Sequence, residues 1–322
     1  MFRSFLLAMM LVVMSASSSL AAITLKLGHI ADPANPYAQA AEHFAKLVKE
    51  RTNGEVIIQV YPSSQLGNQR DLIEGLTFGT VDLTLSSSAV LGNFIPEIAV
   101  LDLPFMFRDI PHAYKSLDTV GMEICKQGEA RGIKTLALWE NGIRHMTNNE
   151  RPIRVPADME GLKIRVMEQP IYIEMMKALG ASPTPMAFGE LYTALQKGVI
   201  DGQENPLAHI ATKRFYEVQK FISLSAHTYG AEPLLMGMIA WNKLNKKQQE
   251  VVSQAALDTC IWQRDLCRKM EDTFLKTILD SGKSKVNDDV DKAAFAKATQ
   301  NVWKFYTDKF GTKNVDAIQN IK

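Results

Sequence analysis

The feature that most restricts the fold of this chain is a regular alternation of strand and helix patterns near its amino terminus. The strand patterns alternate apolar with polar side chains, and the helical patterns place apolar side chains on one face. Gly54 and Gly79 follow the two helical patterns, where helices commonly end. The strands are expected at 23–30, 55–61 and 81–85, and the helices at 36–53 and 68–78. This order is typical of a parallel α/β layer.

The same kind of pattern returns in the second half of the chain. Strands are expected at 133–138, 162–166 and 199–201, a loop at 202–206, and helices at 171–179, 188–197, from 207, 244–279 and 290–321. About 300 residues exceed the usual size of one domain. Two α/β lobes and a helical tail are therefore predicted. Because no Pro- or Ser-rich linker separates the lobes, we expect them to share crossing segments.

Residues 1–21 have the three parts of a secretory signal peptide. Arg3 is followed by an apolar run from Phe5 to Met14 and then by small, polar residues that end at Ala21. We predict cleavage after Ala21. A membrane anchor is the less favoured alternative, because the apolar run is shorter than the roughly 20 residues that span a bilayer. We therefore expect a periplasmic protein that does not insert into the membrane after cleavage.

Charge and cysteine content argue against other classes of protein. Arg3 is the only charged residue in 1–21. The rest of the chain therefore has 35 basic and 35 acidic residues, and its formal charges balance. Nucleic acid is therefore not an expected partner. Of the three cysteines, Cys260 and Cys267 are about 10 Å apart on a predicted helix, which is too far for a disulfide. We expect these two and Cys125 to be buried free thiols.

The familiar signatures of enzymes and metal sites are missing from the sequence. It has no Gly-x-Ser-x-Gly elbow, no phosphate-binding glycine loop and no His-Glu-x-x-His pair. The six histidines are scattered and form no Cys/His cluster with metal-ligand spacing. We therefore expect no catalytic residues, no metal and no cofactor. A two-lobe periplasmic enzyme remains the alternative, since catalytic residues can lie far apart in sequence.

Two arginines are candidates for binding an anion. Arg165 lies in the middle of a predicted strand, and Arg144 follows Asn141-Gly-Ile where the chain leaves a strand. A guanidinium inside an α/β lobe needs an anionic partner because burying it alone is costly. Its planar fork fits a carboxylate. That carboxylate belongs either to a ligand or to the chain itself, and the internal candidates are Glu168, Glu190 and Glu204.

Six segments carry a resemblance to a known family. They are Tyr61–Gly67, Leu103–Phe107, Gly161–Val166, Gly180–Phe188, Asp201–Pro206 and Phe215–Phe221. In this order they resemble the substrate-binding subunit of tripartite ATP-independent periplasmic (TRAP) transporters, the DctP-type family, from about residue 23 to 320. The resemblance implies an α/β periplasmic-binding-protein fold, with two lobes joined by crossing hinge strands and by a long helix. Lobe I is expected at 22–142 plus 231–270, and lobe II at 143–230 plus 271–322.

The resemblance also implies a function and four site residues. Such a protein captures a small organic acid and delivers it to the TRAP membrane permease subunits. Arg165 is expected to clamp the ligand carboxylate and Arg144 to add a second cationic contact. Asn205 is expected to bond the carboxylate region, and Phe188 to pack on the ligand body. The alternatives are a turn role for Asn205 and a core role for Phe188.

The choice of acid depends on where this chain departs from other members. Ser87 and Val90 stand where sialic-acid-binding members carry a glutamate and an arginine, which disfavours sialic acid. The segments at 139–142 and 103–108 are more similar to members that bind sugar acids. We therefore expect a uronate, an aldonate or a keto-sugar acid. C4-dicarboxylates, 2-oxo acids and aromatic acids remain alternatives, as does a sensor module in place of a transport protein.

Four further residues are candidates for binding the sugar part of a sugar acid. Trp139 is expected to stack on the apolar face of the sugar. Glu140, Gln203 and Glu232 are expected to accept hydrogen bonds from hydroxyl groups. Each of these residues has the alternative of an ordinary core or surface position.

Overall fold

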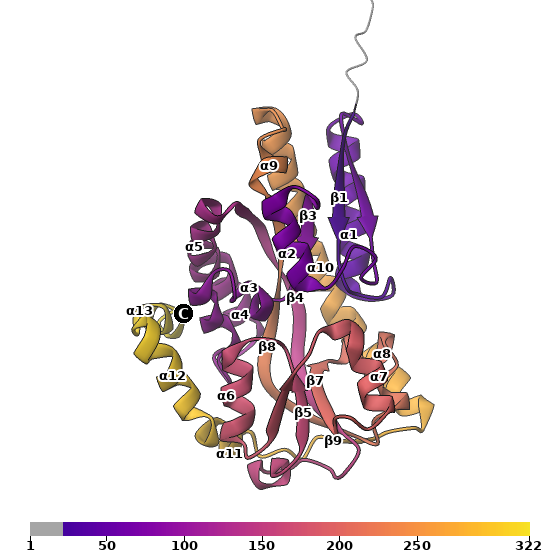
Figure 1. Ribbon diagram of the computed structural model, residues 1–322, viewed down its shortest axis with the longest axis vertical. Helices are drawn as coiled ribbons and strands as arrows, with labels where there is room; N and C mark the ends of the chain where they lie inside the picture. The colour runs from indigo at the N-terminus through magenta and orange to yellow at the C-terminus, as the bar shows by residue number, and fades with distance from the viewer. Residues whose placement is uncertain (1–21) are drawn as a thin grey trace, which may run out of the picture.

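The computed structural model describes residues 22–322, so the predicted signal peptide lies outside the described residues. A single mixed sheet runs through the molecule in the order β2-β1-β3-β8-β4-β7-β5-β6, and β9 pairs with β8 (Figure 1). The strands are β1 (Ile23–Gly28), β2 (Val56–Tyr61), β3 (Leu83–Leu85), β4 (Ile133–Asn148), β5 (Lys163–Val166), β6 (Ser182–Pro185), β7 (Gly202–Pro206), β8 (Phe221–Gly237) and β9 (Lys285–Asn287).

Two long strands in the middle of the sheet join its two ends. β4 and β8 pair in antiparallel fashion along almost their whole length, with three shifts of register. On one side lie β1, β2 and β3, and on the other side lie β5, β6 and β7. Both long strands therefore pass from one lobe to the other, which confirms the expected crossing hinge strands.

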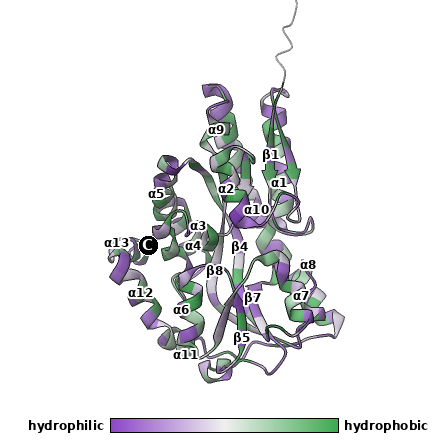
Figure 2. Ribbon diagram, in the orientation of Figure 1, coloured by the Kyte–Doolittle hydropathy of each residue, from purple (hydrophilic) through white to green (hydrophobic). Residues whose placement is uncertain are grey.

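The helices cover both faces of this sheet. They are α1 (Pro36–Arg51), α2 (Gln69–Phe78), α3 (Ser88–Leu91), α4 (Ile110–Ser116), α5 (Met122–Cys125), α6 (Pro170–Ala178), α7 (Leu191–Gln196), α8 (Leu207–Thr212), α9 (Met238–Trp241), α10 (Lys246–Ser281), α11 (Lys292–Ala298), α12 (Gln300–Phe310) and α13 (Lys313–Gln319). Figure 2 shows hydrophobic and hydrophilic residues alternating along their ribbons, as expected for helices that bury one face. No helix within residues 22–322 combines the length and the apolar character of a membrane span.

The long helix predicted from the sequence is α10. Its 36 residues extend for about 54 Å at 1.5 Å per residue. Val252 near its start belongs to the core around β1 and α1, whereas Phe274 and Ile278 near its end belong to the core around α7 and α8. One helix thus contributes to the cores of both lobes. Cys125, Cys260 and Cys267 are buried and free, as predicted.

Three strands that were missed or misplaced are buried along most of their length, whereas the missed strands β6 and β9 are short and partly exposed. β8 was not predicted, β4 continues ten residues beyond the expected 133–138, and β7 forms where a loop was expected. The strand predicted at 199–201 is wrong, because none of these residues is part of a strand and β7 begins only at Gly202. Strands buried on both faces do not alternate apolar with polar side chains, so the periodicity that predicts a strand is absent from them.

The carboxyl-terminal tail contacts the segment at 97–112, which was assigned to the other lobe. Trp303 Nε1 donates to the Pro104 carbonyl at 2.9 Å, and the Tyr306 hydroxyl donates to the Glu97 carbonyl at 2.9 Å. α12 also packs against α6. The tail therefore bridges the two sides of the molecule, and the exact division of the chain into lobes stays a prediction.

Candidate ligand-binding site

The candidate site lies where the strands of the two lobes end beside the hinge. In open α/β sheets, ligands bind at the carboxyl ends of the parallel strands. Here His29 follows β1, Ser87 follows β3, and Met167 follows β5. The Ser87 hydroxyl donates to Met167 Sδ at 3.4 Å. The ends of the two lobes therefore face each other in direct contact.

Arg165 is a buried cation that has no carboxylate partner within residues 22–322. It lies on β5, opposite Gln203 of β7, and is only 2% exposed. Its Nε and Nη2 atoms donate to the Met186 carbonyl at 2.9 and 2.7 Å, while Nη1 has no partner. Burial lowers the pKa of Arg165 to about 10, so the guanidinium is still charged at neutral pH. The Nη1/Nη2 edge is thus free to bind an anion.

Arg144 differs from Arg165 because the chain supplies its carboxylate. Arg144 Nε donates to Glu204 Oε2 at 2.5 Å and Nη2 donates to Glu204 Oε1 at 2.8 Å. Both side chains are fully buried. Burial by itself would raise the pKa of Glu204, but the charge of Arg144 and the hydrogen bonds from His227 and Arg144 together outweigh that effect and lower the pKa to about 2. Of the two predicted cations, Arg144 is therefore the one with an internal ion pair.

The Arg144–Glu204 pair continues into a polar chain across the hinge strands. His227 Nε2 lies 3.3 Å from Glu204 Oε2, and His227 Nδ1 lies 2.8 Å from Ser225 Oγ. Ser225 Oγ accepts a hydrogen bond from the Met146 amide at 3.2 Å. β8 is bulged at this point. The buried network therefore holds β4, β7 and the bulge of β8 in one arrangement.

Gln203 and Asn205 belong to the same network. Asn205 Oδ1 accepts from Arg144 Nη2 at 3.2 Å, and Asn205 Nδ2 donates to Gln203 Oε1. Gln203 Nε2 in turn donates to Thr147 Oγ1 at 3.0 Å. Alternate residues of β7 point to the same face, and Arg165 lies opposite Gln203. The two amides thus lie beside the free guanidinium.

Phe188 lies close to two cations. The Arg165 guanidinium carbon and Lys213 Nζ are each 6.0 Å from the centre of its ring. The ring meets His209 edge to face at 4.9 Å. Lys213, directly after α8, has no ion pair in the part of the chain that the structure describes, and the sequence had not singled it out. Phe188 therefore marks a positively charged entrance to the site.

Beyond Phe188 is a wall of buried polar groups that lack partners. Rings lie edge to face in sequence along it, with His209 and Tyr37 at 5.6 Å and Tyr37 and His29 at 5.8 Å. Within residues 22–322 no hydrogen bond reaches either ring nitrogen of His29, the Tyr37 hydroxyl, Ser86 Oγ, Asn141 Oδ1, His209 Nδ1 or Glu232 Oε1. Buried polar atoms are rarely left unpaired. Their concentration here indicates a place for a polar ligand.

Two of these groups are held in a defined protonation state by burial. Burial, assisted by the charge of Lys213, lowers the pKa of His29 to about 4. Burial raises the pKa of Glu232 to about 8, and Glu232 Oε2 accepts a hydrogen bond from Asn141 Nδ2 at 2.6 Å. At neutral pH His29 is neutral and Glu232 is largely protonated. This end of the site therefore offers uncharged donors and acceptors.

The sequence had not identified His29, Tyr37 or His209 as site residues. His29 follows the first strand of a parallel layer, so the rule that ligands bind at strand ends is the signal by which it could have been found. Tyr37 and His209 lie inside predicted helices and carried no comparable signal. No three His, Cys, Asp or Glu side chains in residues 22–322 are grouped so that they could hold a metal ion.

Two predicted contacts lie elsewhere. Trp139 is fully buried in the core of the first lobe, where its Nε1 donates to the Ala256 carbonyl at 3.2 Å. Glu140 forms an ion pair with Arg268 of α10 and accepts a hydrogen bond from the Tyr114 hydroxyl. The predicted stacking of Trp139 and the predicted ligand bond of Glu140 are therefore wrong. α10 covers this part of β4 and supplies both partners.

We expect Trp139→Phe to lower stability without changing ligand affinity. The substitution removes the hydrogen bond to Ala256 and leaves space in a packed core, which costs about 1–3 kcal/mol. Urea unfolding measures the first effect and titration calorimetry with a bound acid the second. A loss of affinity of tenfold or more would restore the stacking role.

Val90 and Phe188 lie on the two sides of a narrow pocket. Beside Arg165 is a pocket of about 20 Å³ whose walls come from both lobes, with Arg70 and Val90 on one side and Phe188 on the other. That volume is about one water molecule. The two lobes are therefore almost closed over the site.

Comparison with known proteins places the chain among solute-binding proteins. The family model described as "Bacterial extracellular solute-binding protein, family 7" matches residues 27–309. A 2,3-diketo-L-gulonate-binding periplasmic protein of Escherichia coli is 37% identical over 287 residues, which are 89% of this chain and 87% of that protein. An uncharacterized protein of Sinorhizobium fredii is 42% identical over 283 residues, and the chain spans only 52% of its length.

Solved structures agree with the sequence relatives. A TRAP periplasmic solute-binding protein from Polaromonas, bound to D-erythronate, has a TM-score of 0.91 and 38% identity over 93% of this chain and 99% of its own. One from Sulfurospirillum deleyianum with succinate has a TM-score of 0.90 and 34% identity, over 94% of this chain and 100% of its own. One from Roseobacter denitrificans with β-D-glucuronate has a TM-score of 0.89 and 33% identity over 93% and 100%.

Proposed function

Because the chain belongs to family 7 of the bacterial extracellular solute-binding proteins, the DctP family, we propose that it is a periplasmic TRAP solute-binding protein whose Arg165 clamps the carboxylate of its ligand. The observation that carries the assignment of Arg165 is its burial without a carboxylate partner in the described chain. A buried guanidinium in this state is costly. A ligand carboxylate on its free edge removes that cost.

We propose a sugar acid as the ligand. Arg165 binds the carboxylate, and Phe188 packs on the carbon chain next to it. The hydroxyl groups reach the uncharged wall, where Tyr37, His29 and Glu232 have unpaired polar atoms. A polyhydroxy chain satisfies such a wall because every hydroxyl both donates and accepts. The relatives that bind erythronate, glucuronate and diketogulonate support this class of ligand.

The proposed mechanism is closure of the two lobes on the acid. His29 and Ser87 come from one lobe and Arg165 and Phe188 from the other. A ligand that contacts both sets stabilises only the closed arrangement. Closure also excludes water, which strengthens the bonds between the guanidinium and the carboxylate. The closed form is then the one that docks on the membrane permease.

A panel of acids tests the proposed function. Sugar acids, dicarboxylates, 2-oxo acids and aromatic acids are added separately to the purified protein and its melting temperature is measured. A ligand at about a thousand times its dissociation constant adds roughly 4 kcal/mol of stability. We expect a rise of about 5–10 °C with uronates or aldonates. A folded protein that no acid stabilises would contradict the proposal.

Mass spectrometry of the same mixtures separates binding from catalysis. We propose that the chain does not transform its ligand, so the acid is expected to be recovered unchanged after long incubation with the protein. A new product that depends on the protein would favour the two-lobe enzyme instead.

A dicarboxylate is the second candidate, and Lys213 is the observation that favours it. Its ammonium and the Arg165 guanidinium lie on one aromatic ring, so they are at most twice 6.0 Å apart. Two cations at such a separation can hold the two ends of a short di-acid. The relative that binds succinate is of this kind.

Lys213→Met decides between the two candidates. For a di-acid held by both cations, we expect a loss of affinity of about tenfold or more, since one carboxylate loses its partner. For an aldonate or a uronate we expect less than a threefold change. Titration calorimetry measures both, with Lys197→Met, an exposed lysine after α7, as the control. Equal losses for mono- and di-acids would contradict this separation of roles.

A further inference from the structure

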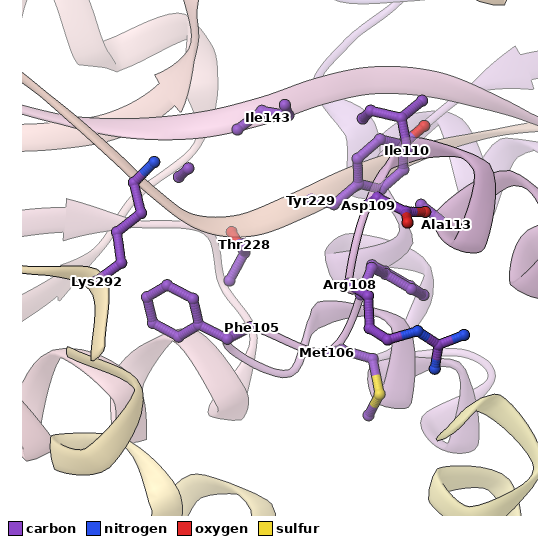
Figure 3. Close-up of a pocket in the computed structure, with 12 residues that line it drawn as sticks. Phe105, Met106, Arg108, Asp109, Ile110, Ala113, Ile143, Thr228, Tyr229 and Lys292 are labelled. Carbon is purple, nitrogen blue, oxygen red and sulfur yellow. The ribbon is translucent and has the colours of Figure 1, made fainter. Parts of the chain in front are cut away.

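A second cavity lies at the hinge and shares no residue with the proposed acid site (Figure 3). Its volume is about 270 Å³. Its walls come from the segment 105–113, from Ile143 of β4, from residues 226–229 of β8 and from Lys292 of α11. It therefore touches the segment before and within α4, both crossing strands, and the start of the carboxyl-terminal helices.

The walls of this hinge cavity are mainly apolar. Phe105, Phe107, Ile110 and Ile143 are all partly exposed to it. The ring of Phe107 meets that of Tyr229 edge to face at 5.7 Å, so the two rings pack together in one wall. Ligand pockets are typically concave and apolar in this way, with a few polar groups that orient the ligand.

The charged groups at the rim leave one cation without a partner. Arg108 donates to the carbonyls of Gln319 and Ile321. Asp109 Oδ1 accepts from the His112 amide at 2.8 Å and so caps α4. The Lys292 side chain has no ion pair or hydrogen bond to any of the residues 22–322. In Figure 3, Lys292 lies at the left and Arg108 at the right, and Phe105 lies between them.

We infer that the hinge cavity is a second binding site, for a small monocarboxylate with an aliphatic or aromatic body. The carboxylate pairs with Lys292, and the apolar body fills the space between Phe105, Ile143 and Tyr229. This ligand class follows from the lining, because Thr228 Oγ1 and the Tyr229 hydroxyl are its only buried polar side-chain atoms without a partner in the described chain, and the other walls are mainly apolar.

The backbone around the cavity indicates that such a ligand acts on the hinge. Phe105 and Ala226, both in the lining, have φ angles of 54° and 46°, a region that costs energy for residues other than glycine. The Phe105 amide donates to the His227 carbonyl at 2.9 Å, which ties this wall to the network of Glu204. A ligand that favours one arrangement of these walls changes the affinity of the acid site. By reciprocity, the acid changes the affinity of the cavity by the same factor.

The test uses octanoate and 4-phenylbutyrate as probes on the full protein. Titration calorimetry is expected to show binding to the wild type, a loss of about three- to tenfold in Lys292→Met, and a larger loss in Lys292→Glu. Lys297→Met, an exposed lysine on the same helix, is the control and is expected to bind normally. Arg165→Ala is expected to keep the probe affinity, because the cavity does not include Arg165.

The coupling is measured by titrating a sugar acid with and without octanoate. We expect its dissociation constant to change by at least threefold, and the converse titration to change by the same factor. Only this last step rests on the proposed function. Probe binding that is lost in Arg165→Ala but kept in Lys292→Glu would overturn the inference, because the probes would then occupy the acid site. A wild type that binds sugar acids but neither probe would overturn it and leave the proposed function intact.

Discussion

Arg165→Ala is expected to abolish high-affinity binding of the acid. Arg165 is 2% exposed, and its free Nη1/Nη2 edge is the proposed partner of the carboxylate. Removing one partner of a buried charge pair costs about 2–5 kcal/mol, which is a loss of roughly 30- to 5,000-fold in affinity. The carboxylate would then be buried without any cation on that side. Titration calorimetry with the best acid from the panel measures the loss.

A conservative variant shows whether ligand affinity depends on the planar fork of Arg165 or only on its charge, and a second variant is the control. Arg165→Lys keeps the charge but replaces the planar fork with a single ammonium, so we expect intermediate affinity. Arg214→Ala removes an exposed arginine close in sequence to Lys213 and is expected to leave binding unchanged. If Arg165→Ala binds the acid within threefold of the wild type, the clamp lies elsewhere and Arg165 is only structural.

Glu204→Gln is expected to cause the largest loss of stability. The side chains of Arg144 and Glu204 are 1% and 0% exposed, so the substitution leaves the Arg144 charge buried without its carboxylate. Breaking such a pair costs about 3–5 kcal/mol. For a chain of this size we expect the melting temperature to fall by roughly 5–15 °C. Asp308→Ala, which removes the exposed ion pair with Lys304, is the control and is expected to change stability by less than about 1 kcal/mol.

The pH dependence of stability follows from the lowered pKa of Glu204. Its carboxylate has an ordinary pKa of 4.5 when unfolded and about 2 when folded. The stabilisation is therefore present above pH 4.5 and is lost as the pH falls toward 2. Urea unfolding is measured between pH 2 and 7. As the pH falls, the free energy of unfolding is expected to decrease more steeply in the wild type than in Glu204→Gln. Equal slopes in the two proteins would contradict the role given to this ion pair.

The local patterns of the sequence predict much of the fold. The amino-terminal caps of α1, α2 and α10 are Asn35, Asn68 and Asn245, whose side chains accept hydrogen bonds from backbone amides of the first helical turn. Gly79 ends α2 with a φ of 74°, which glycine adopts without strain. Such signals depend on residues a few positions apart. For that reason the parallel layer at 23–85 and the long helix could be read in advance.

The same local patterns do not reveal strands or site residues that depend on distant partners. β7 reads as a loop because Gln203, Glu204 and Asn205 are polar, and it forms a strand because their partners are brought to them from β4 and β8. The sequence around Trp139 is equally compatible with a core position and with stacking on a sugar. The position of α10, more than a hundred residues later, puts it in the core.

The sequence alone predicts that Arg144 and Arg165 need anionic partners. It also names the internal candidates for that role, which are Glu168, Glu190 and Glu204. Only the tertiary structure decided that Glu204 pairs with Arg144 and that Arg165 has no such partner in the described chain. The wall formed by His29, Tyr37 and Glu232 is a property of the structure in the same way. A charge pair or an unpaired polar atom depends on distances of a few ångströms between residues far apart in sequence, and periodicity, capping and composition carry no information about those distances.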